Sequence, residues 1–225
     1  MTQQRITPVT KPTVGAVDVP GSKSITNRAL IIAAIAEGKS TLHGVLDSAD
    51  SQACIASLKH MSVSLRASGT SVAISNLSSS RDLIAGSHNK KADTVVKPRY
   101  DVKQTKGHDD IINITPNDAG TVTRFLLPVC AAFPGTYYFC GSKRMNERPI
   151  GPLLDVLKQQ GVQFEFEDQE NHMPLTMHTE GLQGGEVFID ISQSSQFLSG
   201  LMLAAPYAKE TMRIQASTMV NKPYV

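Results

Sequence analysis

The sequence predicts an α/β protein in which helices are buried between layers of sheet. Two observations carry this prediction: three segments share one layout, and their helical runs are apolar on almost every side. Each segment has small polar residues, then an apolar run, then a short run rich in β-forming residues, and they lie at 23–43, 118–139 and 194–214. A helix that is apolar all round has to be covered on all sides, and sheets on either side of it provide that cover.

The spacing within the three segments favours one supersecondary unit that is used three times. In each segment the β-rich run begins 16 residues after a small polar residue, at Ser40 after Ser24, Thr136 after Gly120 and Thr211 after Ser195. Coincidence is the alternative, because capped helices that lead into strands are common in α/β proteins. If the three helix starts converge, their backbone N–H groups and dipoles form one site that attracts anions.

The first helix start combines hydroxyl groups with two cations. Residues 20–28 read PGSKSITNR and run directly into ALIIAAIA. Ser22 or Ser24 can cap the helix, and Lys23 and Arg28 follow within a turn or so, which suits a phosphate group. An ordinary capped surface helix is the alternative. A nucleotide P-loop is excluded by spacing, because Ser22 separates Gly21 from Lys23.

After the first repeat, the pattern predicts a helix followed by a pair of strands. Residues 49–61 are typical of an amphipathic helix, and we expect Asp47 and Asp50 to cap it rather than to act as acid and base. Residues 63–67 and 71–75 alternate as strands do, with a turn at Ser-Gly-Thr between them.

The rest of the chain continues in the same way, apart from one long polar stretch. Residues 150–160 predict a helix that ends near Gly161, followed by strands at 162–167 and 186–191. Residues 76–110 are rich in Ser, Lys and Asp and have almost no periodicity. We therefore expect a loop or an insertion there.

Composition narrows the class of protein. The 225 residues carry a net charge of +2, with no Trp and only 5% aromatic residues, which argues against a nucleic-acid partner. No apolar run approaches membrane-spanning length and the N-terminus is too polar for a signal peptide, so we expect a cytoplasmic protein. Of the three cysteines, two sit in apolar runs as small buried hydrophobes do, and neither Cys nor His has metal-site spacing.

Three further features suit a binding or catalytic site, and each also has an ordinary structural explanation. Gly120, ahead of Thr121 and Arg124, allows a ligand to approach the backbone, although tight packing explains a glycine equally well. Arg148 is held extended by the proline after it and can form a bidentate fork, although it can equally be a solvated loop arginine. The hydroxyls and amide of residues 194–196 suit a polyhydroxylated ring, although simple capping would account for them.

Taken together and in order, these motifs resemble the 5-enolpyruvylshikimate-3-phosphate (EPSP) synthase family. The segments that carry the resemblance are Pro20–Ser24 with Asn27 and Arg28, Leu46–Ser48, Asp118–Thr121 with Arg124, Arg144–Gly151, Ser194–Phe197 and Lys222–Tyr224. The resemblance implies an enolpyruvyl transferase-like inside-out α/β barrel domain built from repeated βαβαββ units, with helices buried between sheets. It further implies that residues 1–15 are a strand region that crosses to a second domain, that 16–225 are most of the N-terminal domain, and that the C-terminal domain is absent.

The resemblance also implies an activity. Members of the family transfer the enolpyruvyl group of phosphoenolpyruvate to the 5-hydroxyl of shikimate 3-phosphate and release phosphate, a step of aromatic amino-acid biosynthesis by the shikimate pathway. They use no metal or organic cofactor, and glyphosate competes for their phosphoenolpyruvate site. We expect the complete protein to be a monomer and the 225-residue chain alone to be inactive, since the second domain supplies further acidic and basic groups.

Site residues follow from the resemblance position by position. Lys23 lies between the two substrates as the catalytic residue of this half. Shikimate 3-phosphate is held by Lys23, Ser24, Arg28, Ser194, Ser195, Gln196 and Tyr224, and phosphoenolpyruvate by Lys23, Gly120, Arg148 and Gln196. The chain departs from the commonest pattern at Asp118, Phe125 and Asn221, where Asn, Pro and Ser are frequent.

Two alternatives remain open at this point. The sister transferase that acts on UDP-N-acetylglucosamine shares the fold, but it typically has Lys-Asn where this chain has Lys23 and Ser24, and it has a catalytic loop cysteine. The other alternative is a non-catalytic phosphate-binding module. Phosphate release separates an enzyme from a binding module, and substrate choice separates the two transferases.

Overall fold

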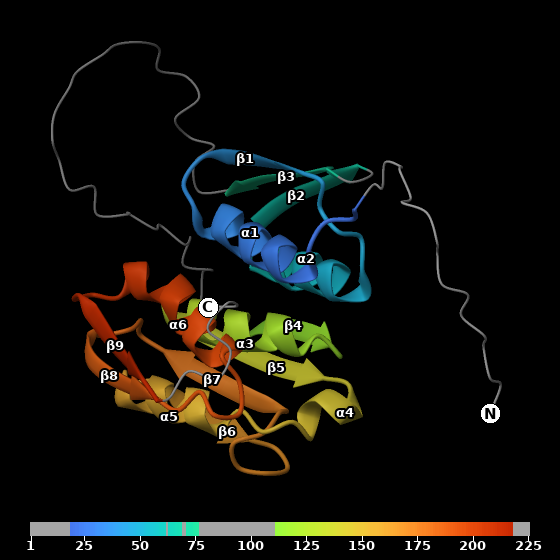
Figure 1. The fold of residues 1–225 in the computed structure, drawn as a ribbon. Coiled ribbons are helices and arrows are strands. Elements are labelled where there is room, and N and C mark those ends of the chain that lie inside the picture. Colours follow the sequence, from blue (N-terminus) through green and yellow to red (C-terminus); the bar gives the residue numbers. More distant parts are fainter. Residues whose placement is uncertain (1–18, 62, 69–70, 77–110, 218–225) are drawn as a thin grey trace, which may run out of the picture.

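A computed structural model describes residues 19–61, 63–68, 71–76 and 111–217 of the chain. The expectations for residues 1–15 and for 77–110 therefore lie outside the described residues. In Figure 1 a small sheet lies above a layer of helices, and a larger sheet lies below that layer with one more helix on its far side. This is the α/β arrangement with helices between sheets that the sequence predicts.

The first structural unit alternates helix and strand and ends in a hairpin. Its elements are α1 (Lys23–Ile35), β1 (Lys39–His43), α2 (Ala49–His60), β2 (Val63–Ser68) and β3 (Ser71–Asn76). The three strands form an antiparallel sheet in the order β1-β3-β2. The predicted helices and the predicted strand pair of this unit are confirmed.

The second unit repeats this order and adds a strand at its start. Its elements are β4 (Ile111–Asn117), α3 (Gly120–Ala131), β5 (Gly135–Gly141), a short α4 (Lys143–Asn146), α5 (Gly151–Gln159), β6 (Gln163–Phe166) and β7 (Leu175–Thr179). The sheet order is β4-β5-β7-β6, with β4 and β5 parallel and the other pairs antiparallel. As in the first unit, the last strand lies between the two that precede it.

The third unit contains the same opening as the second. Its elements are β8 (Gly185–Ile189), α6 (Gln196–Ala204), a 3₁₀ turn (Ala205–Tyr207) and β9 (Met212–Ala216), and β8 pairs with β9 in parallel. The strands β1, β5 and β9 begin 16, 15 and 16 residues after the starts of α1, α3 and α6. The repeat that the sequence predicts is therefore present in the fold.

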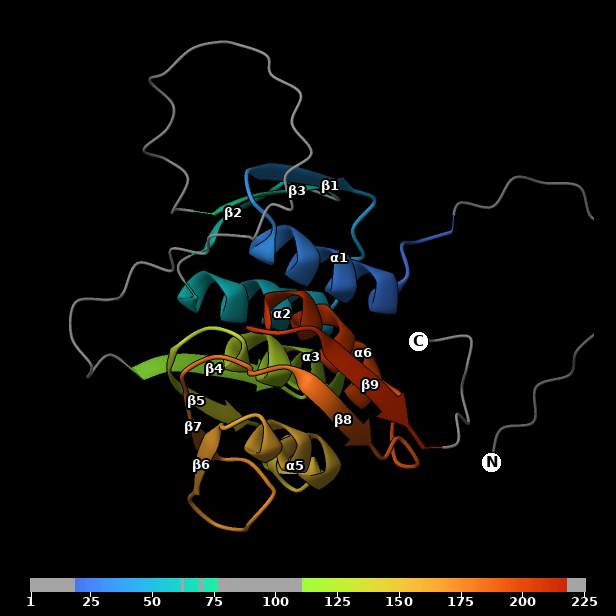
Figure 2. The same cartoon turned by 90° about the vertical axis from the view of Figure 1, so that its left-hand side faces the viewer.

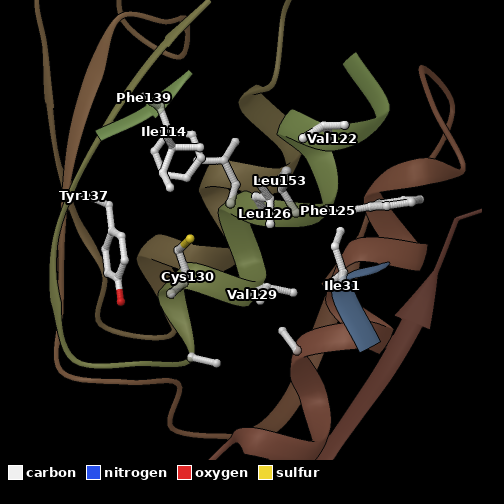
Figure 3. Packing of buried hydrophobic residues seen from close by; sticks show 14 of the residues in the cluster. Ile31, Ile114, Val122, Phe125, Leu126, Val129, Cys130, Tyr137, Phe139 and Leu153 are labelled. Carbon is white, nitrogen blue, oxygen red and sulfur yellow. The ribbon is translucent and has the colours of Figure 1, made fainter. Parts of the chain in front are cut away.

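Helix α3 is the centre of the core because nearly all its residues are buried. Figure 3 shows Leu126 and Cys130 of this helix pointing toward the strand residues Ile114 and Phe139, whereas Val129 points to the side where Ile31 of α1 lies. All six side chains are completely buried. A helix with two apolar faces thus joins the strands on one side to α1 on the other.

Helix α6 packs against α3 at unusually short range. A Cβ atom added to Gly200 of α6 would overlap the carbonyl oxygen of Arg124 and lie 2.9 Å from Cγ of Pro128. Figure 2 shows the two helices next to each other between α1 and the larger sheet. Glycine at this position lets the two backbones touch.

The cap of α2 differs from the expectation. Asp47 and Asp50 do not cap this helix; Ser48 does, because its side chain accepts a hydrogen bond from the backbone N–H of Ser51 and the Ser51 side chain accepts one from the backbone of Ser48. This reciprocal pair satisfies two helix-end donors at once. Asp50 instead lies in the first turn, where its charge favours the helix dipole.

The two cysteines in apolar runs are buried as predicted, which makes their thiols unreactive in the folded chain. Burial raises the pKa of Cys54 to about 12 and raises that of Cys130 as well. At pH 8 only about one Cys54 in ten thousand is then a thiolate, the reactive form. We expect a thiol reagent at pH 8 to label half-buried Cys140 first, and to label Cys54 and Cys130 only after denaturant is added.

The same burial makes stability depend on pH. Both thiols have a higher pKa in the folded chain than in the unfolded one, so the unfolded chain loses these protons first as the pH rises. The free energy of unfolding should therefore fall above about pH 9. Rapid labelling of all three cysteines in the native chain at pH 8 would contradict the burial on which both predictions depend.

Candidate functional site

The N-terminal ends of α1, α3 and α6 meet at one end of the helix layer. Arg28 near the start of α1 donates to Ser199 of α6 at 2.8 Å, and Tyr207 just after α6 donates to the carbonyl of Ile35 at the end of α1 at 2.8 Å. Matching contacts at both ends mean that the two helices run parallel. The first residue of α6, Gln196, bonds to the first two turns of α3, so the third helix starts at the same place.

Neither Ser22 nor Ser24 caps the start of α1 with its side chain, which corrects the expectation for these two residues. Ser22 occupies the N-cap position in an extended conformation without a side-chain hydrogen bond, and Ser24 lies inside the first turn. The entry to the helix is fixed instead by Gly21, where a Cβ atom would overlap the carbonyl oxygen of Gly44. The first-turn N–H groups thus keep their capacity to bind an anion.

Lys23 reaches a carboxylate on the neighbouring helix. Its Nζ lies 3.2 Å from Oδ2 of Asp50, and 51% of the lysine side chain is exposed. An ion pair with so much solvent access is weak, so a charged ligand can compete for the ammonium group. The ion pair therefore places the ammonium group at the helix start, and a ligand anion can still displace Asp50 from it.

Arg28 is held more firmly. Its Nη1 donates to the carbonyl of Ser24 at 3.2 Å, its Nη2 donates to Ser199, and its guanidinium lies 4.8 Å from the ring centre of Phe125. Partial burial lowers the pKa of Arg28, although an arginine stays charged at neutral pH. Contacts to three helices therefore orient this cation.

Two guanidinium groups lie over Gly120 at the start of α3. A Cβ atom at Gly120 would lie 2.8 Å from Nη1 of Arg148 and 3.6 Å from Nη1 of Arg124. Desolvation, and then the charge of Arg148, lower the pKa of Arg124. Within the part of the chain that the structure describes, neither arginine forms a salt bridge with a carboxylate. This surplus of positive charge at a helix N-terminus favours an anion.

Some of the polar groups of residues 194–196, at the start of α6, form hydrogen bonds within the protein itself. The Ser194 hydroxyl accepts from the backbone N–H of Gln196 at 3.2 Å, which is a cap, whereas Ser195 makes no side-chain cap. The Gln196 side chain bonds to two α3 residues: its Oε1 accepts from Nη1 of Arg124 at 2.9 Å, and its Nε2 donates to the hydroxyl of Thr121 at 2.9 Å.

The structure thus brings predicted residues from the three repeats to a common end of the fold. Lys23, Ser24 and Arg28 come from α1, Gly120 from α3, and Ser194, Ser195 and Gln196 from the start of α6, while the Arg148 guanidinium lies beside Gly120. Tyr224 lies outside the described residues. Sequence reasoning missed the contacts that join these helices, which involve Thr121, Arg124 and Ser199; the only signal was the position of each near a helix start.

Two other properties of the described part are relevant to its chemistry. No helix there is long and apolar enough to cross a membrane. Nor do the described residues contain a group of three or more His, Cys, Asp or Glu side chains that could hold a metal ion.

Comparison with known proteins gives a consistent result. The family model of EPSP synthase (3-phosphoshikimate 1-carboxyvinyltransferase) matches residues 8–87 and 76–225. The 3-phosphoshikimate 1-carboxyvinyltransferases of Shewanella pealeana and Shewanella piezotolerans are 38% and 39% identical over 230 and 229 residues, which is 100% of this chain and 47% of each relative. The chain therefore spans about half the length of the curated relatives it matches.

A solved structure agrees at the level of the fold. EPSP synthase from Acinetobacter baumannii superposes with a TM-score of 0.69 at 22% sequence identity, over 92% of this chain and 41% of that protein. The inside-out α/β fold expected from the motifs is therefore confirmed. From the family match over nearly the whole chain, together with this fold, we conclude that the chain belongs to the EPSP synthase family.

Proposed function

We propose that this chain binds shikimate 3-phosphate at the converging helix starts and, as part of a longer protein, transfers the enolpyruvyl group of phosphoenolpyruvate to it. The observation that carries the proposal is the position of Arg28, a cation fixed by α1, α3 and α6 beside a helix start whose N-cap residue makes no side-chain cap. A phosphate at this place would meet the first-turn N–H groups, Lys23 and Arg28 together.

Each residue of the site has a role in this proposal. Ser24, Ser194, Ser195 and Tyr224 offer hydroxyls to the sugar-like ring and phosphate, and Arg28 binds the phosphate. Arg148 and the Gly120 backbone face phosphoenolpyruvate, and the Gln196 amide contacts both substrates. Lys23 lies between the two anions, where its exposed ammonium can leave Asp50 and stabilise both.

The reaction requires no redox step. The 5-hydroxyl oxygen bonds to C2 of phosphoenolpyruvate while C3 gains a proton, and the hydroxyl proton is taken up by a base. The C–O bond to phosphate then breaks and C3 loses a proton, which restores the double bond. Preorganised cations stabilise the charge that develops in such steps, and holding two substrates together lowers the entropic barrier.

The proposal also requires groups from the part of the longer protein that lies outside this chain. We expect that part to supply the acidic group for proton transfer and further cations for phosphoenolpyruvate, so the 225-residue chain alone should be inactive. The complete protein would act as a monomer in the cytoplasm, without metal or organic cofactor and without a nucleic-acid or membrane partner. Release of phosphate from phosphoenolpyruvate by the purified chain in the presence of shikimate 3-phosphate would contradict the expected inactivity.

Calorimetric titration of the purified chain with shikimate 3-phosphate tests the binding site. We expect saturable binding that weakens about 10- to 100-fold in Lys23→Ala and in Arg28→Ala, because each removes a charge-assisted contact to phosphate. Arg213→Ala is the matched control, since Arg213 is an exposed cation on β9 and pairs only with exposed Glu186 among the described carboxylates.

The outcomes separate clearly once near-ultraviolet circular dichroism shows that each variant is folded. Equal binding by all four proteins would overturn the proposed site. Absence of binding by the folded wild-type chain would show that this half does not hold shikimate 3-phosphate by itself. Affinity should also fall as salt is added, because the contacts are between charges.

A further inference from the structure

The Gln196 side chain is held at both of its polar ends by α3. Arg124 donates to its oxygen at 2.9 Å, and its nitrogen donates to Thr121 at 2.9 Å. Arg124 is itself oriented, because its guanidinium lies 5.4 Å from the ring centre of Phe197. Its backbone carbonyl is pressed against Gly200, so the helix that carries Arg124 has a fixed position relative to α6.

These contacts determine which way the amide faces. An arginine can only donate hydrogen bonds, so the atom of Gln196 that faces Arg124 must be the oxygen. The amide nitrogen is then turned to Thr121, and one of its two hydrogens remains for another acceptor. With the amide flipped, two donors would face each other at the partly buried guanidinium.

We propose that Arg124 is a positioning residue that acts through Gln196: it fixes the amide so that an N–H, rather than a carbonyl oxygen, is offered to the anionic ligand. This deepens the proposed function and rests on it. A free glutamine would present oxygen or nitrogen with similar ease, and an oxygen would repel a phosphate or carboxylate. The partly buried guanidinium of Arg124 thereby sets the orientation of a neutral hydrogen-bond donor.

The free chain provides the first test. In an NMR spectrum of the 225-residue chain we expect the two side-chain amide protons of Gln196 to show Overhauser contacts to Thr121. In Arg124→Lys, which keeps the charge but lacks the planar fork, these contacts should be lost. Arg213→Lys is the matched control and should leave them unchanged.

The second test is a double-mutant cycle on the affinity for shikimate 3-phosphate. Arg124→Lys and Gln196→Ala should each weaken binding about ten-fold. The double variant should be no weaker than Gln196→Ala alone, because Arg124 acts only through the glutamine. Losses that multiply to about a hundred-fold would overturn the inference, since Arg124 would then act on the ligand directly.

A third variant separates positioning from a general effect on the fold. Gln196→Glu keeps the acceptor for Arg124 but removes the donor, so binding should be at least as weak as in Gln196→Ala while the chain stays folded. Normal binding by Gln196→Glu would contradict the inference. If the wild-type chain does not bind shikimate 3-phosphate, the proposed function of this half fails, and the NMR comparison still decides whether Arg124 positions Gln196.

Discussion

Replacement of Gly200 by alanine is expected to lower the free energy of unfolding by about 2–4 kcal/mol. The new methyl group would overlap the carbonyl oxygen of Arg124 and lie 2.9 Å from Cγ of Pro128. Backbone cannot rotate out of the way as a side chain can, so α6 and α3 have to move apart. The gain of about 1 kcal/mol from replacing a helical glycine offsets only part of that cost.

Urea unfolding followed by circular dichroism measures this effect. Gly151→Ala is the matched control: Gly151 also lies in a helix, and a Cβ atom there has its nearest neighbour at 3.5 Å, an ordinary contact. We expect the control to leave stability unchanged or to raise it by up to about 1 kcal/mol. Equal effects of the two substitutions would show that the close approach of α3 and α6 does not contribute as described.

Replacement of Gln160 by methionine is expected to cost about 3 kcal/mol, with little change in side-chain volume. Gln160 is 4% exposed, and its amide makes two hydrogen bonds to the backbone of Gly184: Nε2 donates to the carbonyl at 3.0 Å, and Oε1 accepts from the N–H at 2.7 Å. Methionine leaves both backbone groups without these partners. An unsatisfied buried polar group costs about 1–3 kcal/mol.

The neighbouring residue provides the comparison for this second change. Gln159 is the same residue type at the end of the same helix, but it is exposed. Gln159→Met should therefore leave the midpoint of urea unfolding almost unchanged. The interpretation of Gln160 as a link between α5 and the start of β8 would be wrong if both variants unfolded at the same urea concentration.

Much of the fold could be predicted because its helices have an unusual composition. The apolar runs of α1, α3 and α6 follow small polar starts, and this pattern located all three helices and the strands after them. Strand β4 and strand β7 were not predicted. Strand β7 is five residues long, pairs with β5 and β6 and has alternate residues buried.

The site was only partly predictable for a related reason. Motifs gave the residue types at each helix start, but not the contacts between the starts. The bond from Arg124 to Gln196 joins residues 72 positions apart, and the bond from Arg28 to Ser199 joins residues 171 positions apart. Local sequence also failed for the α1 cap, because the entry to that helix is set by contact between Gly21 and the distant backbone of Gly44.

The parallel alignment of α1 with α6 has a consequence for synthesis of the protein. Helix α1 is made early, yet its partners Ser199 and Tyr207 lie 171 and 172 residues later in the chain. At about 5–20 residues per second, a ribosome takes roughly ten to thirty seconds to reach them. During that interval one side of α1 has no cover from α6. Among the described helices, α1 is therefore made first, yet it is among the last to be covered on this side.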